Sequence, residues 1–318
     1  MLDVKRLTML RDLAEHGRVT AVAELHGVTP SAVSQQLRVL ETEAGAALIR
    51  REGRILRLTA AGTALAAESE HVLAALERAE GAVRTLDAEP SGELEIGCVP
   101  SALATVAAPL VAELTARHPR LRPRIVESEP EDSVPRLKQH GLDLAVAYRY
   151  HLLGPPPWSG ITAVALFDDP LMVAIPEDLR QAVEDGGLGP LRDRAWISAP
   201  TSSACHEVLV HACRNADFTP RIDHWYSDLR SALSLVATGL AVTVLPNLLC
   251  ADPPAGVAVL PLPGRGRTVE ALVRAGAEHQ PAIAAALTAL ADLNGGETTR
   301  RGHRGGRRQE GETCSFGT

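Results

Sequence analysis

Short apolar runs alternate with amphipathic segments from Glu93 to about residue 293, and this alternation constrains the fold more than any other feature of the chain. The runs, such as "ELEIGCV", "LDLAVAY", "LMVAIP" and "AVTVLP", are typical of buried β-strands. The intervening segments predict helices at 101–117, 131–140, 203–215, 228–238 and 280–293. Strands that alternate with helices indicate parallel sheets with covered faces, and this length suits two such units.

The alternating segment therefore predicts an α/β domain of two lobes at 93–294. We place lobe I at about 93–162 and 268–294, and lobe II at about 163–267. Ligands of such domains bind at the carboxyl ends of strands, close to helix N-termini. Hydroxyl side chains stand at two helix starts of this kind: Ser101 and Thr105, and Thr201 and Ser202.

Helix starts with hydroxyl groups suit a carboxylate or a similar anion, because backbone N–H groups and the helix dipole favour negative charge there. We therefore predict a small-molecule, anionic effector that is bound between the lobes by these four residues. The alternative is that the same hydroxyls are ordinary helix caps.

The N-terminal segment has a helical pattern of a different kind. Helices are predicted at 4–16 and about 20–26, and a third begins in "TPSAVSQQLRVLE" (29–41). Thr29 is suited to cap this third helix, and Pro30 at its first position loses no useful N–H group. Short helices joined by a tight turn, with a further helix supporting them, predict a helix-turn-helix.

The outer face of the third helix carries short polar side chains and one cation. A helix that enters the major groove needs such side chains, because they reach base edges and phosphates. The alternative is a solvated polar face. We predict that double-stranded DNA is contacted by Thr29, Ser31, Ser34, Gln35 and Arg38.

The stretch "LIRREGRILRLT" (48–59) predicts a β-hairpin, or wing, directly after the helix-turn-helix. Arg51 and Arg54 would add phosphate contacts, which salt weakens. A solvated hairpin is the alternative. Together these elements predict a winged helix-turn-helix DNA-binding domain at 1–59.

A long helix is predicted at about 60–88, with apolar positions that alternate at spacings of four and three from Leu65 to Leu86. A heptad pattern of this kind needs a partner helix, most simply from a second copy of the chain. We therefore assign 60–89 to a linker and dimerisation helix, and Pro90-Ser91-Gly92 to a short connection.

Charge and composition fit this division. Residues 1–62 carry a net charge of +2, residues 300–318 carry +3, and the segment between them carries −12, so a basic head is joined to an acidic body. The tail at 295–318 has too little apolar surface to pack, which predicts disorder. No apolar signal segment opens the chain, and five cysteines without a CxxC motif suit the reducing cytoplasm.

Membrane association and metal binding are not expected. The uncharged run from Ser231 to Ala251 is broken by glycine and proline, and it predicts a helix, a turn and a buried strand. In "CHEVLVHAC" (205–213), His206 and His211 are five residues apart, too far round a helix to share a metal. We find no P-loop, GxGxxG motif or catalytic triad, so we expect neither an enzyme nor a cofactor.

The sequence resembles the LysR-type transcriptional regulators. The matching residues are Thr20, Ala23, Val28, "SAVSQQL" at 31–37, "LE" at 40–41, Gly45, Leu48, Arg51, "LT" at 58–59 and Ala61-Gly62. Looser matches follow in order, among them "GELEIGCVPS", "LKQHGLDLAV" and "VATGLAVTVLP", so that the resemblance covers roughly 1–293. Pro30 departs from the family, because many members place a base-reading glutamine there.

The resemblance implies a winged helix-turn-helix, a linker helix and an effector domain like the periplasmic solute-binding proteins. It also implies a homodimer or homotetramer on an inverted-repeat operator, and it places Ser101 and Ser202 at effector-contacting positions. Peroxide-sensing members carry two cysteines in the region of Cys205 and Cys213, with a spacing one residue longer than here, so a redox-sensing regulator is the alternative. An enzyme or a solute-binding protein on the same fold is the competing class.

Overall fold

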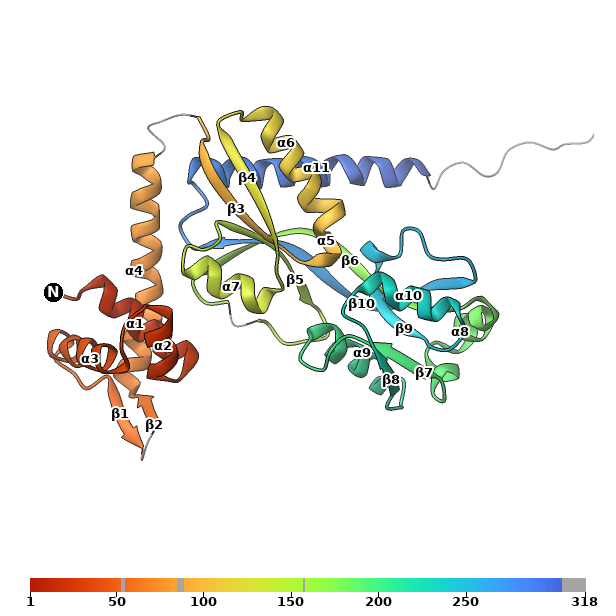
Figure 1. Cartoon of the computed structure of the whole chain (residues 1–318), viewed down its shortest axis with the longest axis horizontal. Helices are drawn as coiled ribbons and strands as arrows, with labels where there is room; N and C mark the ends of the chain where they lie inside the picture. The colour runs from red at the N-terminus through yellow and green to blue at the C-terminus, as the bar shows by residue number, and fades with distance from the viewer. Residues whose placement is uncertain (53–54, 85–88, 157, 305–318) are drawn as a thin grey trace, which may run out of the picture.

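The structure, a computed structural model, describes residues 1–52, 55–84, 89–156 and 158–304. A small N-terminal head is followed by one long helix and a larger α/β body (Figure 1). The elements of the head and of the long helix are α1 (Val4–His16), α2 (Val19–Leu25), α3 (Pro30–Ala44), β1 (Ile49–Glu52), β2 (Ile55–Leu58) and α4 (Ala60–Arg84).

The head has its own hydrophobic core, built from one apolar stripe on each helix. Leu10 of α1, Val22 of α2 and Leu37 of α3 are fully buried against one another's helices. The predicted cap is present, because the Thr29 hydroxyl accepts a hydrogen bond from the N–H of Ala32 at 3.2 Å. The expected helix-turn-helix and wing are therefore confirmed as local structure.

The long helix α4 packs closely against the wing at its start. A Cβ atom on Gly62 would overlap the carbonyl oxygen of Leu48, so glycine is needed where α4 passes the residue that precedes β1. The Thr59 hydroxyl caps the helix by accepting from the N–H of Gly62 at 3.0 Å. The last residues of the predicted helix, 85–88, lie outside the described residues.

The body is built on one sheet of six strands, in the order β4-β3-β5-β10-β6-β9. These strands are β3 (Gly92–Cys98), β4 (Leu121–Glu127), β5 (Leu144–Tyr150), β6 (Ile161–Pro176), β9 (Thr243–Pro246) and β10 (Val257–Arg274). A further parallel pair, β7 (Ala195–Ser198) and β8 (Arg221–Trp225), lies in lobe II.

The alternation indicated parallel sheets, and this is true of only part of the body: among the described residues, β3 pairs parallel with β4 and β5, β7 pairs parallel with β8, and a single parallel bridge joins Trp196 to Val242. The long strands β6 and β10 run through both lobes and pair antiparallel. A chain that leaves lobe I along one strand and returns along its neighbour must reverse direction. The pairing is interrupted between Pro261 and Gly266, and Gly266 then faces Pro170, so the two crossings lie side by side.

Helices cover both faces of this sheet (Figure 1). They are α5 (Pro100–Ala102), α6 (Ala108–Arg117), α7 (Pro130–Lys138), α8 (Arg180–Gly186), α9 (Ala204–Arg214), α10 (Leu229–Ala237) and α11 (Pro281–Arg304). The run from Ser231 to Ala251 contains most of α10 and the buried strand β9, as predicted. In the part of the chain that the structure describes, no helix is long and apolar enough to cross a membrane.

The helix α11 extends to Arg304, which corrects our prediction that the chain has no structure from residue 295. The sequence Asn294-Gly295-Gly296 does not end the helix. Once a helix is nucleated, each added residue gains a hydrogen bond without a new nucleation cost. The rest of the predicted tail, 305–318, lies outside the described residues.

Candidate DNA-binding face and effector cleft

The outer face of α3 is polar and solvent-exposed. Thr29, Ser31, Gln35 and Arg38 are exposed, and Ser34 is half-buried. The Ser34 hydroxyl donates to the carbonyl oxygen of Pro30 at 2.9 Å, and the hydroxyl oxygens of Thr29 and Ser31 lie 3.0 Å apart. The structure thus brings all five predicted residues to the free side of one helix, while the opposite side lies in the head core.

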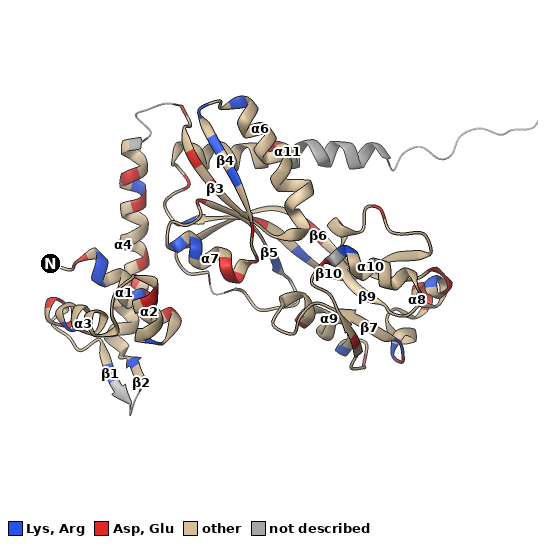
Figure 2. Cartoon of the chain, in the orientation of Figure 1, with Lys and Arg blue, Asp and Glu red and all other residues tan. Residues whose placement is uncertain are grey.

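The wing adds positive charge beside this helix (Figure 2). Arg50 and Arg57 are exposed register partners on the two strands. These two arginines make this part of the wing basic, which suits an anion such as a phosphate. The side chain of Arg51 and the whole of Arg54 lie outside the described residues, and their DNA contacts stay predictions.

The apolar seam of α4 is covered at one end and open at the other. Ser69 is buried, whereas Val72, Leu76 and Val83 have exposed fractions of 41%, 40% and 69%. Leu86, the last position of the seam, lies outside the described residues. Exposed valine and leucine side chains at helical spacing leave an apolar stripe that a second helix can cover.

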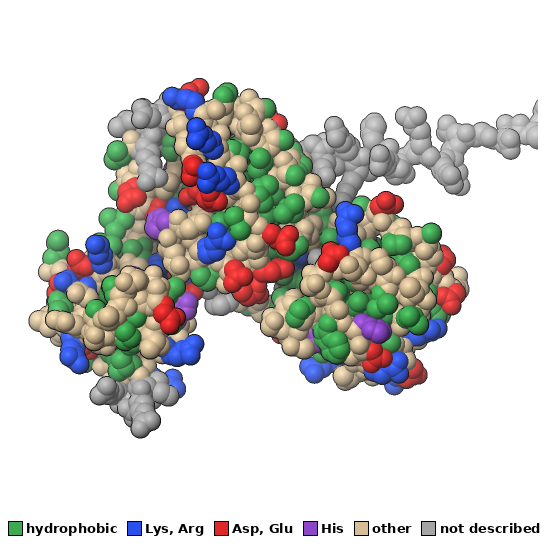
Figure 3. Space-filling view, viewed as in Figure 1, with side chains coloured by type: hydrophobic (Ala, Val, Ile, Leu, Met, Phe, Trp, Pro, Cys, Tyr) green, Lys and Arg blue, Asp and Glu red, His purple; other side chains and the backbone are tan. Residues whose placement is uncertain are grey.

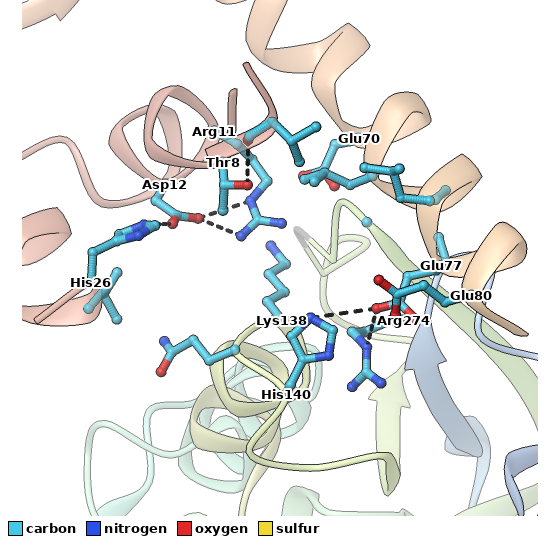
Figure 4. Close-up of a pocket in the computed structure, with 18 residues that line it drawn as sticks. Thr8, Arg11, Asp12, His26, Glu70, Glu77, Glu80, Lys138, His140 and Arg274 are labelled. Atoms are coloured by element: carbon cyan, nitrogen blue, oxygen red, sulfur yellow. Dashed lines mark hydrogen bonds and ion pairs between the residues drawn. The ribbon is translucent and has the colours of Figure 1, made fainter. Parts of the chain in front are cut away.

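The head, α4 and the body meet around a cavity of about 390 Å³ (Figure 4). Lys138 of α7 donates to the Glu15 carboxylate of α1 at 2.6 Å, and Arg274 of β10 donates to Glu77 of α4 at 2.8 Å. His140, which lies beside Glu77, has its pKa lowered by burial and by the positive charge of Arg274. Ion pairs therefore join the body to both the head and the long helix.

A buried arginine lies at the centre of the interlobe cleft. Arg267 is 1% exposed, and its Nε and Nη2 atoms donate to the Asp169 carboxylate at 2.9 Å. Its Nη2 atom also donates to the Ser101 hydroxyl at 2.8 Å. The guanidinium lies 4.7 Å from the ring centre of Tyr148 and 5.8 Å from that of Tyr150.

The two tyrosines extend this network toward both lobes. The Tyr148 hydroxyl donates to Glu129 of lobe I at 3.0 Å, and the Tyr150 hydroxyl lies 3.2 Å from the Cys205 thiol of lobe II. Burial raises the pKa of the Glu129 carboxyl and of both tyrosines. The polar groups of the cleft therefore satisfy one another in a buried, closed arrangement.

The predicted effector residues do not form one pocket. Ser101 lies in the buried network, but Thr105 is exposed in a π-helical turn, and Thr201 and Ser202 are exposed in the turn before α9. Ser203 caps α9 instead, accepting from the N–H of Cys205 at 3.2 Å. The four hydroxyls do not converge, because the Ser101 hydroxyl is bonded to the buried Arg267, whereas Thr105, Thr201 and Ser202 are exposed.

A second cavity, of about 620 Å³, opens at the mouth of the cleft. It lies between α7, the end of β5, the segment that follows β5, and the start of α9, and Tyr148, Tyr150 and Trp158 line it. None of the four predicted effector residues is in its wall. Among the described residues, no group of three or more histidine, cysteine or acidic side chains could hold a metal ion.

Sequence reasoning missed the centre of the cleft, which is Arg267 with Asp169 and the two tyrosines. One signal was available: the chain has only three tyrosines, and Tyr148 and Tyr150 follow each other on alternate positions at the end of one strand. The pairing of Arg267 with Asp169 joins residues 98 positions apart, and no local pattern indicates it.

Comparison with known proteins agrees with this architecture. The family described as "Bacterial regulatory helix-turn-helix protein, lysR family" matches residues 4–63, and the "LysR substrate binding domain" matches residues 87–294. Similar curated proteins include the transcriptional dual regulator GltC of Bacillus subtilis (25% identity, 79% of this chain, 83% of GltC). The regulator CatR of Pseudomonas putida is 30% identical over 77% of this chain and 83% of CatR.

A similar solved structure is a cysteine mutant of OxyR from Corynebacterium glutamicum. It has a TM-score of 0.55 and 21% identity, and the match covers 96% of this chain and 95% of that chain. The predicted fold class, a winged helix-turn-helix with a linker helix and a two-lobed α/β effector domain, is thereby confirmed. From the head through the effector domain, the chain belongs to the LysR family of bacterial transcriptional regulators.

Proposed function

We propose that this LysR-family regulator reads an inverted-repeat operator with two copies of α3, under the control of a small molecule bound between its lobes. Its family and its relatives are regulators, so the chain is not an enzyme. We place its activity in the cytoplasm, where the DNA lies.

The exposed face of α3 is the observation that carries the DNA-binding part. Gln35 and Arg38 project from the free side of the head, where glutamine can pair with adenine, and arginine with guanine or phosphate. Arg50 and Arg57 on the wing supply positive charge for the phosphate backbone. Pro30 cannot donate to a base, so these neighbours carry the recognition.

The open apolar stripe of α4 supports pairing with a second copy of the chain. Val72, Leu76 and Val83 are exposed, although Leu76 also lines the cavity between α4, the head and the body. Covering each of them removes apolar surface from water at roughly 25 cal/mol per Å². A pair of α4 helices would set two heads at a fixed spacing, which suits an inverted repeat.

The interlobe network supports control by a ligand. Arg267 and Asp169 stand where the chain crosses between the lobes, and Ser101 and Cys205 approach from either side. A ligand that favours another spacing of the lobes would shift the balance of two quaternary states. The anionic effector stays a prediction from the sequence.

Selection of bound DNA from random duplexes by the purified full-length protein, followed by titration at rising salt, tests this proposal. We expect an inverted-repeat motif whose affinity falls steeply with salt. Leu76→Asp should give monomers in sedimentation, and the variant should no longer prefer the inverted repeat. Leu103→Asp cannot serve as its control, because Leu103 packs against the body core and the substitution would disturb the fold. Thr115→Ala, an exposed change on α6, is the matched control. Binding without any sequence preference would refute the proposal.

Redox sensing through Cys205 and Cys213 is the second candidate, and the contact between the Cys205 thiol and the Tyr150 hydroxyl favours it. Both cysteines lie on the single helix α9, eight residues and about 12 Å apart, so a disulfide requires α9 to unwind. Peroxide treatment of the protein and of Cys205→Ser tests it. An operator affinity that does not respond to peroxide would exclude this candidate.

A further inference from the structure

The wall of the 620 Å³ cavity at the cleft mouth is largely apolar. Three aromatic rings, one leucine and four prolines line it, namely Tyr148, Tyr150, Trp158, Leu153, Pro130, Pro135, Pro155 and Pro156. A concave wall of this kind buries the apolar part of a small organic ligand, while a few polar groups set its orientation.

The charged side chains of the same wall are mainly acidic. Glu15, Glu131 and Glu207 line the cavity, and Arg149 is the single cation among its described lining residues. Both Nε and Nη2 of Arg149 donate to one oxygen of Glu270, at 3.2 and 3.1 Å, so this charge is already compensated. Acidic side chains also gather at the boundary of the lobes in the surface view (Figure 3). The charge left for a ligand is negative.

The two helix starts at the cavity do not reverse this sign. Glu131 stands in the first turn of α7, and Glu207 stands in the first turn of α9. The protein's own carboxylates thus occupy the positions at which a helix dipole attracts an anion. Both helix starts at this cavity therefore disfavour an anion there, and the anionic effector at Ser101 and Ser202 stays a separate prediction.

One of the three carboxylates belongs to the DNA-binding head. Glu15 is near the end of α1, its side chain is 27% exposed, and it already accepts from Lys138 at 2.6 Å. Lys138 is 4% exposed and lies at the end of α7, whose start forms part of the same wall. A ligand charge near Glu15 therefore competes with Lys138 for a carboxylate of the head.

We propose that this cavity binds a small organic cation with an apolar body, and that Glu15 makes the DNA-binding head part of the binding site. Glu131 and Glu207 face the ligand charge from the two lobes, and the aromatic wall covers the apolar body. The binding site itself does not depend on the proposed function. Only the statement that this cation is the effector rests on it. Binding loosens the Glu15–Lys138 pair and so changes the position of the head relative to the body.

Calorimetric titration of the full-length protein with three probes of similar shape tests the site. The probes are 2-phenylethylamine, which is an ammonium ion at neutral pH, 3-phenylpropanoate and neutral 2-phenylethanol. We expect the amine to bind most tightly and the carboxylate least. Glu131→Gln and Glu207→Gln should each weaken amine binding about two- to fivefold, the effect of a partly exposed ion pair, without weakening 2-phenylethanol.

Asp132→Asn is the matched control, because Asp132 is also in the first turn of α7 but does not line the cavity. It should leave amine binding unchanged. Equal or tighter binding of the carboxylate, no binding of the amine, or equal losses in the control and in Glu131→Gln would each overturn the site. The titration contains no DNA, so a negative result would count against the ligand site but not against the proposed DNA binding. A failure to bind an operator would count against the proposed DNA binding but not against the ligand site.

The part played by Glu15 has a separate readout. Lys138→Met removes the competing cation and should tighten amine binding, whereas Glu15→Gln should weaken it. In Glu15→Gln, operator affinity should no longer respond to the amine, although the protein still binds DNA. If both variants changed the binding of amine and alcohol equally, Glu15 would have only a structural role.

Discussion

The exposed face of α3 and the interlobe cleft both contain hydroxyl groups and an arginine, but the hydrogen bonds of these groups are arranged in opposite ways. On α3, Thr29 and Ser34 bond to backbone groups three or four positions away, and Arg38 is exposed. In the cleft, Arg267 is buried and bonds to Ser101, 166 positions away. The first region can lose a side chain and stay folded, whereas in the second region the polar groups are part of the folded core.

Asp169→Ala should have the largest effect, and it tests whether the buried polar groups of the cleft are part of the folded core. It leaves the buried charge of Arg267 without its carboxylate, and we expect a loss of about 3–5 kcal/mol in the free energy of unfolding of the body, measured in urea. Asp168→Asn is the matched control, because the Asp168 side chain is 80% exposed, and its change should stay within about 0.5 kcal/mol. Equal effects of the two substitutions would mean that the buried pair does not stabilise the fold.

On α3, Gln35→Ala and Arg38→Ala should lower DNA binding and leave the stability of the fold unchanged. Each should lower operator affinity by about 1–3 kcal/mol, roughly five- to 150-fold, in a gel-shift titration at fixed salt. Urea unfolding should be unchanged, since both side chains are exposed. A loss of stability comparable to the loss of affinity would place these side chains in the head core, against the structure.

The hydrogen bond that caps α3 is local, and its loss should cost less stability than the loss of the buried Arg267–Asp169 pair. Thr29→Ala removes the acceptor for the N–H of Ala32 and should destabilise the start of α3 by about 1 kcal/mol. Hydrogen exchange of the first α3 amides measures this directly. Thr29→Ser keeps the hydroxyl and should restore most of the protection, and failure to do so would assign the effect to the lost methyl group.

The smallest effect is expected for His140, at the cavity where the head, α4 and the body meet. Because the pKa of His140 is lowered in the folded protein, the unfolded chain takes up a proton first as the pH falls below about 6.5, and stability decreases there. His140→Asn should remove part of this decrease, by less than about 1 kcal/mol, in melting curves at pH 7.5 and 5.5. Asparagine tolerates the positive φ of 58° at this position. An unchanged pH profile would exclude His140 as the titrating group.

The same contrast explains what could be predicted from the sequence. Thr29, Pro30 and the apolar stripe of α3 are local signals, and they predicted the helix, its start and its free face. The pairing of β6 with β10, and of Arg267 with Asp169, depends on contacts far apart in the chain. The effector residues show the same limit: Thr201 and Ser202 are exposed in the turn before α9, away from Ser101, and their contact with an effector stays a prediction.

The adjacent crossings of the long strands have an evolutionary consequence. The chain enters lobe II along β6 next to Pro170 and returns along β10 next to Gly266, and these residues are register partners. The segment between them begins and ends at adjacent positions. It could therefore be replaced by the corresponding segment of a relative while the two connections to lobe I stay in place. New ligand preferences could then arise by swapping one half of the cleft, leaving the operator-reading apparatus untouched.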